Sequence, residues 1–403
     1  MIYDCAIIGL GVGGVFALHR ISTKYKEMKV LGIEASRPPS KRRSQTMGFF
    51  GMFPNSDGKL YLSNLPKVAE IIGLQKTKSS HTAVKQILSQ IETYKIIKDR
   101  SPNLAMQNKL DKIGYQCFLN DYIQIYPKEI HALSKYMVGI MEQNSNVKFS
   151  YDNEVLNIVK NKNIFTITTE YGEFKSKKLI LSVGHAGWRW AQEIYAKLGI
   201  IENNDTARFG IRIETNAHIM KDFNRSNCTI KKTGLELGPL SWNGTVIPVD
   251  HFDMAISDFR SNEERWETDK VSFNLIGDRS FPNQGFEQTD RLAKLTFLIA
   301  NDRISKERVS TIINGRSKIS IMREYDWLKP VIQELATVLP EIITKSHFHV
   351  PTVIPMAPKI NIKSNLESDI SGMYVIGESA GVHGLLAAAC MGVAVGDFVV
   401  KKG

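Results

Sequence analysis

Cysteine is scarce in this chain of 403 residues, and its four cysteines lie far apart. They are Cys5, Cys117, Cys228 and Cys390, so no Cys-x-x-Cys pair is present. Zinc ribbons and thioredoxin-like redox pairs both need cysteines at that spacing, and the sequence excludes both. The histidines show no metal-site spacing either, so we expect no metal site. Reduced thiols and a cytoplasmic location are the expectation for such a chain.

A long uninterrupted apolar run is also missing. The most apolar segment, residues 373–400, contains Glu378, His383 and Asp397, which a membrane helix tolerates poorly. No basic stretch precedes the apolar run at the N-terminus, as it would in a signal peptide. We therefore expect no membrane span and no membrane partner.

The composition is that of a globular protein with an excess of positive charge. Hydrophobic residues make up 43% and charged residues 23% of the chain, and the length favours two or three domains at about 150 residues each. The net charge of +11 favours an anionic partner, which is a phosphate-bearing cofactor, an acidic metabolite or nucleic acid. The basic residues are scattered, with the tightest cluster at 41–43. The oligomeric state stays open.

A glycine-rich turn near the N-terminus is the first feature with a specific chemistry. Residues 3–8 read as a buried parallel strand and are followed by GLGVGG and a helical pattern. Gly9, Gly11 and Gly14 match G-x-G-x-x-G, in which they allow a tight turn, close approach of a pyrophosphate, and packing of helix on strand. The helix N-terminus attracts phosphate.

An acidic residue follows this turn at the expected place. Glu34 ends the second strand, 20 residues after Gly14, which is the spacing of the acid that accepts ribose hydroxyls. The turn and the acid together predict a dinucleotide site. The alternative is a glycine-rich turn without a ligand, beside a solvated glutamate.

A second motif lies near the C-terminus. Gly377-Glu378-Ser379-Ala380-Gly381 follows an apolar strand at 371–376 and leads into a helix of small residues at 381–399. The arrangement resembles the second flavin fingerprint of FAD-dependent oxidoreductases of the glutathione-reductase-like superfamily. The resemblance implies that Glu378 binds the ribityl chain, with Gly377, Gly381 and Leu385 around the helix N-terminus that faces the flavin. Such an N-terminus stabilises negative charge on reduced flavin. The alternative is an ordinary buried alanine-rich helix.

Most of the chain is similar to the uncharacterised family described as NAD(FAD)-utilizing dehydrogenases. The similar segments are GFFGMFPNSDGKL at 48–60, LILSVGHAGWRW at 179–190, FGIRIE at 209–214 and GRSKIS at 315–320. Asn55 and Ser379 depart from the family pattern, which leaves the substrate open. The superfamily pattern further implies that the backbone at Val155 brackets the adenine and that Gly184 lets the chain approach the cofactor. Arg42 is a further candidate cofactor contact.

These features predict an α/β fold with a discontinuous Rossmann-like FAD-binding domain. Rossmann-type elements lie at both ends of the chain, and the texture between them differs. We assign segments 1–60, 121–200 and 346–403 to the FAD-binding domain and 201–345 to an inserted α+β substrate domain. Segment 61–120 is expected to be a helical excursion.

Three residues are candidates for catalysis. His383 lies directly before the C-terminal helix and is either a general acid/base or a residue that holds its loop. Lys59 lies in the loop expected to pass over the flavin, where it contacts flavin, substrate or solvent. Arg316 comes from the inserted domain and could clamp a carboxylate or phosphate, as could Arg323. A further histidine, His185, and two tryptophans, Trp188 and Trp190, follow the strand at 179–183, and we expect the tryptophans to pack.

The sequence thus predicts an FAD-dependent oxidoreductase that passes a hydride or electrons through flavin N5 on an anionic small molecule. One alternative is a flavoenzyme acting on nucleic acid, either of the tRNA-modifying type or a phage lyase of DNA hypermodification. A non-catalytic flavoprotein and an NAD enzyme without flavin are two more. The lack of a second G-x-G-x-x-G argues against a separate NAD(P)H domain.

Overall fold

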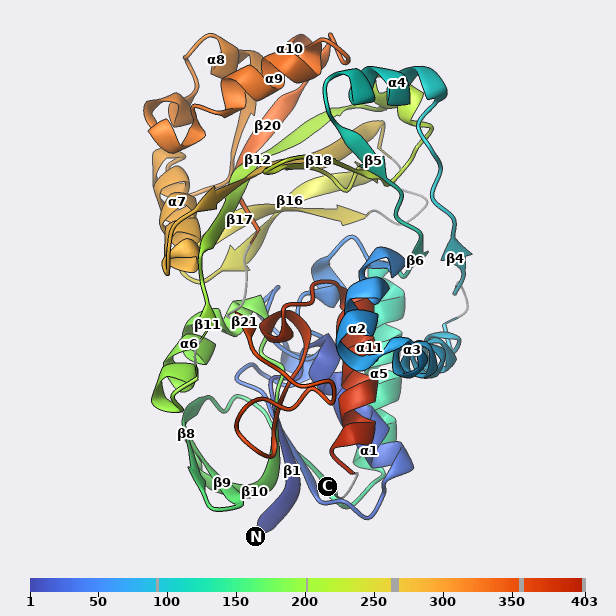
Figure 1. The fold of residues 1–403 in the computed structure, drawn as a ribbon, viewed down its shortest axis with the longest axis vertical. Coiled ribbons are helices and arrows are strands. Elements are labelled where there is room, and N and C mark those ends of the chain that lie inside the picture. The colour runs from blue at the N-terminus through green and yellow to red at the C-terminus, as the bar shows by residue number, and fades with distance from the viewer. Residues whose placement is uncertain (92–93, 201, 262–267, 355–358, 401–403) are drawn as a thin grey trace.

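Two sheets organise the molecule, one in each half (Figure 1). The computed structural model describes residues 1–91, 94–200, 202–261, 268–354 and 359–400. One half holds a mainly parallel, Rossmann-like sheet and both ends of the described chain, and the other half holds an antiparallel sheet. The predicted fold class, a discontinuous Rossmann-like domain with an inserted α+β domain, is confirmed.

The parallel sheet is assembled from distant parts of the chain. Its order is β7-β2-β1-β10-β9-β8, with β22 beside the end of β10. The strands β7, β2, β1, β10 and β22 are parallel, while β9 and β8 extend the sheet as an antiparallel meander. The bounds are β1 (Ile2–Ile8), β2 (Val30–Ile33), β7 (Val147–Ser150), β8 (Val155–Asn161), β9 (Ile164–Thr169), β10 (Gly172–Leu181) and β22 (Met373–Val375).

Helices cover this sheet on both sides (Figure 1). They are α1 (Val12–Lys24), α2 (Leu65–Ile72), α3 (Leu74–Leu88), α5 (Pro127–Glu142), α6 (Trp188–Lys197) and α11 (Leu385–Phe398). The helices α1 and α11 pack so closely at Gly392 that an added Cβ there would lie 2.3 Å from the carbonyl oxygen of Gly13. Since α1 follows β1 and α11 follows the parallel strand β22, both helices start at the carboxyl edge of the sheet, where such folds bind ligands.

A buried carboxylate joins three of these helices. Asp397 of α11 accepts hydrogen bonds from Arg20 of α1 at 2.8 and 3.0 Å, from Lys76 of α3 at 2.6 Å and from the Tyr25 hydroxyl at 2.9 Å. Lys24 lies 3.3 Å away. Burial opposes the charge on Asp397, but the hydrogen bonds from Arg20, Lys76 and Tyr25 outweigh it and hold the pKa of this carboxyl well below its usual range.

Replacing Asp397 by asparagine is expected to lower the free energy of unfolding at pH 7 by about 3 kcal/mol, because it leaves the partly buried cations of Arg20 and Lys76 without their counter-ion. Since the folded-state pKa is depressed, the stabilisation is present above about pH 4 and is lost as the pH falls below it. Urea unfolding at neutral and acidic pH measures both effects. Lys24→Met is the control, because Lys24 is 49% exposed and should contribute little. An Asp397→Asn effect that does not shrink in acid would contradict this account.

The antiparallel sheet has the order β19-β20-β12-β18-β14-β13-β5, with β15 beside β18. Its strands are β5 (Gln116–Phe118), β12 (Thr206–Asn216), β13 (Thr229–Lys232), β14 (Leu235–Leu237), β15 (Ser241–Trp242), β18 (Lys270–Ser280), β19 (Ser305–Arg308) and β20 (His347–Val353). A hairpin of β16 (Gly244–His251) and β17 (Met254–Ser261) lies between this sheet and the parallel-sheet half (Figure 1). The helices of this half are α4 (Leu104–Lys112), α7 (Gly285–Ile299), α8 (Val309–Ile313), α9 (Leu328–Ala336) and α10 (Ile342–Lys345).

One face of the antiparallel sheet is apolar and the other carries polar groups. Ile211 and Ile213 of β12 pack into the core beneath α9, together with Leu328 and Ile332. Side chains alternate between the faces of a strand, so Arg212 points to the opposite face, toward the hairpin. This alternation brings a charged side chain to the junction between the two halves.

Two segments of the chain differ in part from the assignment made from the sequence. β20 lies within 346–403, the segment expected in the FAD-binding domain, but it pairs with β12 and β19 of the antiparallel sheet. The segment 61–120 contains α2, α3 and α4 but also β4 (Ile96–Ile97) and β5, so it is not purely helical. β4 joins a small sheet with β3 (Lys59–Tyr61) and β6 (Tyr122–Gln124). Strands of two or three residues have little sequence pattern of their own, and their pairing with other strands in the tertiary structure determines whether they form.

The chain crosses between the two halves at several places, because α4 and β5 already lie in the antiparallel half before α5 returns to the other, and two of the crossings run side by side. β11 (Glu202–Asn203) leads into the antiparallel half and pairs with β21 (Lys359–Ile360), which leads back. The domain boundaries as a whole stay a prediction.

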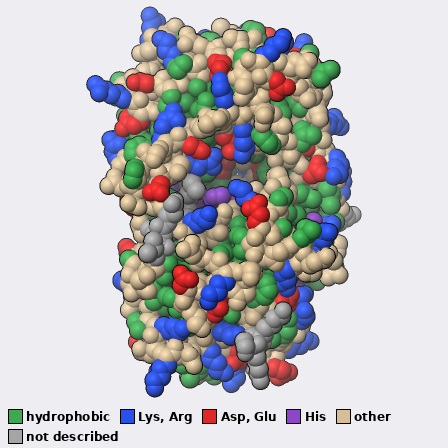
Figure 2. Space-filling view, in the orientation of Figure 1, with side chains coloured by type: hydrophobic (Ala, Val, Ile, Leu, Met, Phe, Trp, Pro, Cys, Tyr) green, Lys and Arg blue, Asp and Glu red, His purple; other side chains and the backbone are tan. Residues whose placement is uncertain are grey.

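Surface charge is dispersed on the face seen in Figure 2, where Lys and Arg side chains are mixed with Asp and Glu over both halves. No basic stripe is visible on that face. Within the ranges given above, no helix has the length and apolar character needed to cross a membrane.

Candidate functional site

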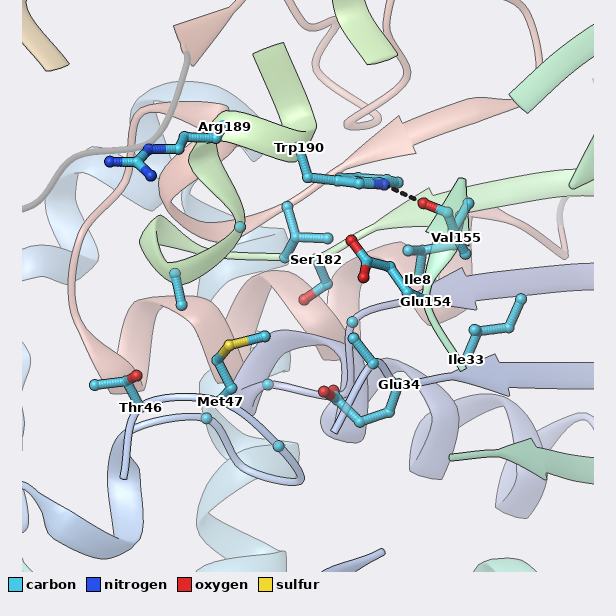
Figure 3. A pocket seen from close by; sticks show the side chains of 18 of the residues that line it. Ile8, Ile33, Glu34, Thr46, Met47, Glu154, Val155, Ser182, Arg189 and Trp190 are labelled. Atoms are coloured by element: carbon cyan, nitrogen blue, oxygen red, sulfur yellow. Dashed lines mark hydrogen bonds between the residues drawn. The ribbon is translucent and has the colours of Figure 1, made fainter. Parts of the chain in front are cut away.

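A cavity of about 380 Å³ opens at the carboxyl edge of the parallel sheet. We call it the first cavity. Its wall includes Gly9 and Gly11 after β1, Glu34 after β2, Val155 at the start of β8, and Ser182 after β10. Figure 3 shows Glu34, Ser182 and Val155 around this space, with Thr46 and Met47 entering from a loop. The sequence motif for a dinucleotide therefore lines a real cavity.

The three glycines of the turn differ in why a larger side chain would be unfavourable at each position. Gly9 has φ of +86°, and a Cβ there would lie 2.7 Å from the carbonyl oxygen of Ser182. A Cβ on Gly14 would lie 2.1 Å from the carbonyl oxygen of Gly9. Gly11 has φ of −63° and its added Cβ would make only an ordinary 3.7 Å contact with Ser182. The fold needs Gly9 and Gly14, whereas Gly11 leaves room in the cavity.

Glu34 lies at the end of β2 with its carboxylate held by the backbone. Oε2 accepts a hydrogen bond from the N–H of Leu10 at 2.8 Å, and Oε1 accepts one from Ser36 at 3.0 Å. Burial raises the pKa of Glu34, although these hydrogen bonds and the nearby Arg42 oppose the shift. Each carboxylate oxygen can accept a second hydrogen bond, so the group remains able to bind hydroxyl donors from the cavity.

Arg42 shapes a loop that lines the first cavity. Its guanidinium donates hydrogen bonds to the carbonyl oxygens of Ser44 at 2.8 Å, Gln45 at 2.9 Å, Phe49 at 2.9 Å and Gly51 at 2.5 Å. Four carbonyl contacts fix the path of residues 44–51. The guanidinium is thus committed to the loop, and its predicted contact with a cofactor finds no support in this geometry.

Val155 lies on the far side of the same cavity. Its carbonyl oxygen accepts a hydrogen bond from the indole N–H of Trp190, as Figure 3 shows. Both residues line the cavity. Trp190, expected to pack, therefore forms part of the wall at the predicted adenine end.

A second cavity of about 350 Å³ lies at the junction of the two halves. It shares Thr46, Met47, Ala186 and Phe252 with the first cavity, so the two adjoin. The parallel-sheet half contributes His185. The inserted half contributes polar side chains from three strands, which are Arg212, Asn274 and Asp258. The second cavity thus places groups from both halves in contact with one space.

An aromatic and charged cluster covers the boundary between the cavities. The guanidinium of Arg189 lies 3.9 Å from the centre of the Phe252 ring and pairs with Asp290 at 2.8 Å. The other oxygen of Asp290 lies 2.7 Å from Nε2 of His251. Trp188 packs edge-on against Phe252. These contacts hold the hairpin tip of β16 and β17 against α6.

The second motif brings a carboxylate between two histidines. Glu378 Oε2 lies 3.0 Å from Nδ1 of His185, and Oε1 lies 3.5 Å from Nδ1 of His383. Burial opposes charge on His185, but the carboxylate and its hydrogen bond outweigh it and raise the pKa of the imidazole. Burial likewise opposes charge on Glu378, yet His185 and then His383 hold its pKa well below the usual range. His185 is the member of this cluster that lines the second cavity.

Four further residues were predicted to contact the cofactor, which are Gly184, Gly377, Gly381 and Leu385. Gly184, with φ of +59°, lies next to His185, and its added Cβ would be 3.9 Å from Glu378. Gly377 and Gly381 both have positive φ, and Leu385 is the first residue of α11. None of these four lines the two cavities described above. Their predicted cofactor contacts stay predictions.

Lys59 is buried away from both cavities. Its ammonium donates a hydrogen bond to Asn227 Oδ1 at 2.6 Å and lies 3.8 Å from Asp57. Burial lowers the pKa of Lys59, although Asp57 and Asp99 oppose the shift. The contact with Asn227 joins the two halves, so the geometry favours a structural role over the catalytic one expected for Lys59.

Arg316 is exposed in the turn after α8. Figure 1 shows α8 at the end of the inserted half far from the parallel sheet. Arg323 is exposed on the following segment. Arg316 lines neither of the two cavities described above, whereas Arg212 lines the second, so the clamping of a substrate by Arg316 finds no support in this geometry.

Arg212, Asp258 and Asn274 are the site residues that sequence reasoning missed. The signal for Arg212 was present in FGIRIE, where a charged residue lies between two isoleucines of a buried strand. Buried charges are paired or functional, and the Nη2 of Arg212 donates to Asp258 at 2.9 Å. Its partners come from strands about 46 and 62 residues away in sequence, which no local pattern identifies. Among residues of the described ranges, no group of His, Cys, Asp and Glu could hold a metal ion.

Comparison with known proteins gives limited results. No protein-family model matches the chain, and no curated protein matches its sequence. Among solved structures, glycine oxidase from Bacillus cereus ATCC 14579 has 13% identity and a TM-score of 0.44, over 98% of this chain and 94% of that one. L-Proline dehydrogenase from P. horikoshii has 10% identity and a TM-score of 0.45, over 99% and 94%. E. coli quinol fumarate reductase has 12% identity and a TM-score of 0.47, over 100% and 71%. These values assign neither a substrate nor a reaction to this chain.

Proposed function

We propose that this chain is an FAD-dependent oxidoreductase that acts on a small molecule. The observation that supports it most is the continuity of the two cavities. The first carries the glycine turn and Glu34, and the second, which adjoins it, carries polar groups from both halves. A dinucleotide cofactor laid from the first cavity toward the second would bring its reactive end to the domain junction, as ligands of α/β sheets do.

The residues of the first cavity fit the adenosine diphosphate portion of FAD. Gly11 leaves open space where a pyrophosphate would approach the backbone. The first N–H groups of α1 have no partner within the helix, and together with the helix dipole they favour an anion. Glu34 retains acceptor capacity for ribose hydroxyls. The start of α11 then offers a second helix N-terminus at the same edge of the sheet.

When bound, FAD supplies a two-electron acceptor that protein side chains lack. The residues of the chain perform the remaining tasks at the second cavity. Arg212 binds an anionic group of the substrate. His185 accepts a proton at Nε2, while Glu378 holds its Nδ1 side and favours the orientation needed for transfer. Phe252 and Arg189 exclude water from the boundary between the cavities.

A small substrate agrees better with the site than a nucleic acid does. The second cavity has a volume suited to small molecules. Nucleic-acid binding needs a continuous basic surface, and Figure 2 shows dispersed charges on the face in view. We therefore favour the small-molecule function over modification of a nucleic-acid base.

Titration of the purified protein with FAD, FMN and NADH tests the cofactor. FAD is expected to bind and to give a flavin band at roughly 450 nm. Because the first cavity fits the adenosine diphosphate portion, ADP should compete with FAD, and FMN, which lacks that portion, should bind more weakly. A protein that takes up NADH but not FAD would contradict the flavin assignment, and one that takes up neither would contradict the dinucleotide site.

A further inference from the structure

The wall of the second cavity carries both signs of charge. Arg212 of β12 lies directly opposite Asn274 of β18 in the strand register, and it pairs with Asp258 of the β16–β17 hairpin. The Arg212 side chain is 7% exposed and that of Asp258 is 25% exposed. Asp250, from the same hairpin, lines the cavity too. Asp250 is exposed, and its Oδ2 accepts a hydrogen bond from the N–H of Gln45 at 2.9 Å, so the carboxylate beside the Arg212 guanidinium is that of Asp258.

The hydrogen bonds of these groups are incomplete within the described ranges. The ion pair is formed by Arg212 Nη2 and Asp258 Oδ1. Arg212 Nη1 and Asp258 Oδ2 make no hydrogen bond with another described residue. Arg212 Nε and Asn274 Oδ1 are buried and have no partner among the described residues. Buried polar atoms are nearly always hydrogen-bonded to protein, water or ligand. This wall therefore has the properties of a site that a polar ligand completes.

The other charged groups of the cavity are already balanced. His185 is paired with Glu378, and His251 with Asp290. Arg212 and Asp258 remain, as one ion pair with opposite charges side by side in the cavity wall. A ligand with anionic groups alone would gain Arg212 but would meet the carboxylate of Asp258 beside it, and like charges close together in a cavity repel strongly.

We propose that the second cavity binds a small zwitterion, with its anionic group on Arg212 and its ammonium group on Asp258. The inference rests on the proposed function. It restricts the expected substrate from any small anion to a molecule that carries both an anionic group and an amine. Such a ligand provides an acceptor for Arg212 Nη1 and a donor for Asp258 Oδ2. Neither buried charge then loses a partner when the ligand displaces water.

Ligand-detected NMR on the purified protein, repeated after addition of FAD, tests the proposal. The probes are glycine, β-alanine and 4-aminobutyrate, which are zwitterions of increasing charge separation, together with propionate and propylamine, which carry one charge each. At least one zwitterion is expected to bind about tenfold more tightly than either single-charge probe. Equal or tighter binding of propionate or of propylamine, or no binding of any zwitterion, overturns the proposal.

Two substitutions separate the two ends of the ligand. Asp258→Asn is expected to remove the preference for zwitterions, so that propionate binds as tightly as they do. Arg212→Met should remove binding of the zwitterion, and Arg212→Lys should retain part of it even where the methionine variant fails to fold. A variant Asp258→Asn that keeps the full preference for zwitterions contradicts the assigned orientation.

A variant in the first cavity distinguishes this inference from the proposed function. Gly11→Val fills the first cavity and is expected to weaken FAD binding, while the preference for zwitterions is measured on the FAD-free parent protein. If the parent protein binds a zwitterion but no FAD, the proposed function fails and the inference stands. If it binds FAD but shows no preference for zwitterions, the inference fails and the flavin assignment stands.

Discussion

Gly11→Val is expected to weaken FAD binding by at least about 100-fold, equivalent to roughly 2.7 kcal/mol, with little change in stability. Gly11 adopts φ of −63°, which other residues share, and its added Cβ would meet no atom closer than 3.7 Å. The valine side chain therefore enters the first cavity and not the protein core. Loss of a favourable helix cap should cost no more than about 1 kcal/mol. FAD titration and urea unfolding of the variant measure the two effects separately.

Gly14→Ala is the matched control, because it acts on the fold. Its Cβ would lie 2.1 Å from the carbonyl oxygen of Gly9, and this overlap forces the turn and α1 apart. We expect a loss of about 3 kcal/mol in unfolding free energy. If Gly11→Val were as destabilising as Gly14→Ala, or if it bound FAD as the parent protein does, the separation of structural and ligand-binding glycines would be wrong.

The glycine turn was the most predictable part of the site because its signal is local. Gly9, Gly11, Gly14 and Glu34 lie within one strand-helix-strand unit, so their spacing in sequence fixes their spacing in the fold. The place of the second motif in the fold was also predictable, since residues 377–381 lie between strand β22 and helix α11, while its contacts with a cofactor stay a prediction. The parallel sheet could be assembled from distant segments for the same reason, because each of its buried strands carries its own pattern.

The second cavity could not be predicted, because its residues meet only through tertiary structure. Arg212 faces the cavity because β12 pairs with β18 in a register that places Asn274 opposite it, and Asp258 arrives on a separate hairpin. The strand pattern around Arg212 indicated a buried charge, whereas Arg316 lies in an exposed turn, but no local pattern indicated which cavity the Arg212 side chain enters. Burial also changed the interpretation of Lys59 from a catalytic to a structural residue, because its ammonium donates a hydrogen bond to Asn227.

Glu378→Gln is expected to lower the pKa of His185 below its ordinary value of about 6.5. In the parent protein the carboxylate of Glu378 outweighs burial and raises this pKa. A neutral amide leaves burial as the dominant influence, and burial disfavours the charged imidazole. Because the folded-state pKa of His185 is raised, its pairing stabilises the fold below about pH 6.5, and this contribution is lost as the pH rises through the folded-state value. NMR titration of the imidazole in the FAD-free protein measures the shift without any assay of activity.

The same substitution separates catalysis from structure at His185. If His185 accepts a proton from the substrate, His185→Ala should lower kcat by about 100-fold or more, and Glu378→Gln should move the acid limb of the pH–rate profile to lower pH. His383→Gln is the control, because His383 lies 3.5 Å from Glu378, against 3.0 Å for His185, and it does not line the second cavity. It should leave that limb nearly in place. Replacing a purely structural histidine changes stability but does not displace the pH–rate profile. If the acid limb of the profile moved in His383→Gln and not in Glu378→Gln, the proton-accepting role would therefore belong to His383.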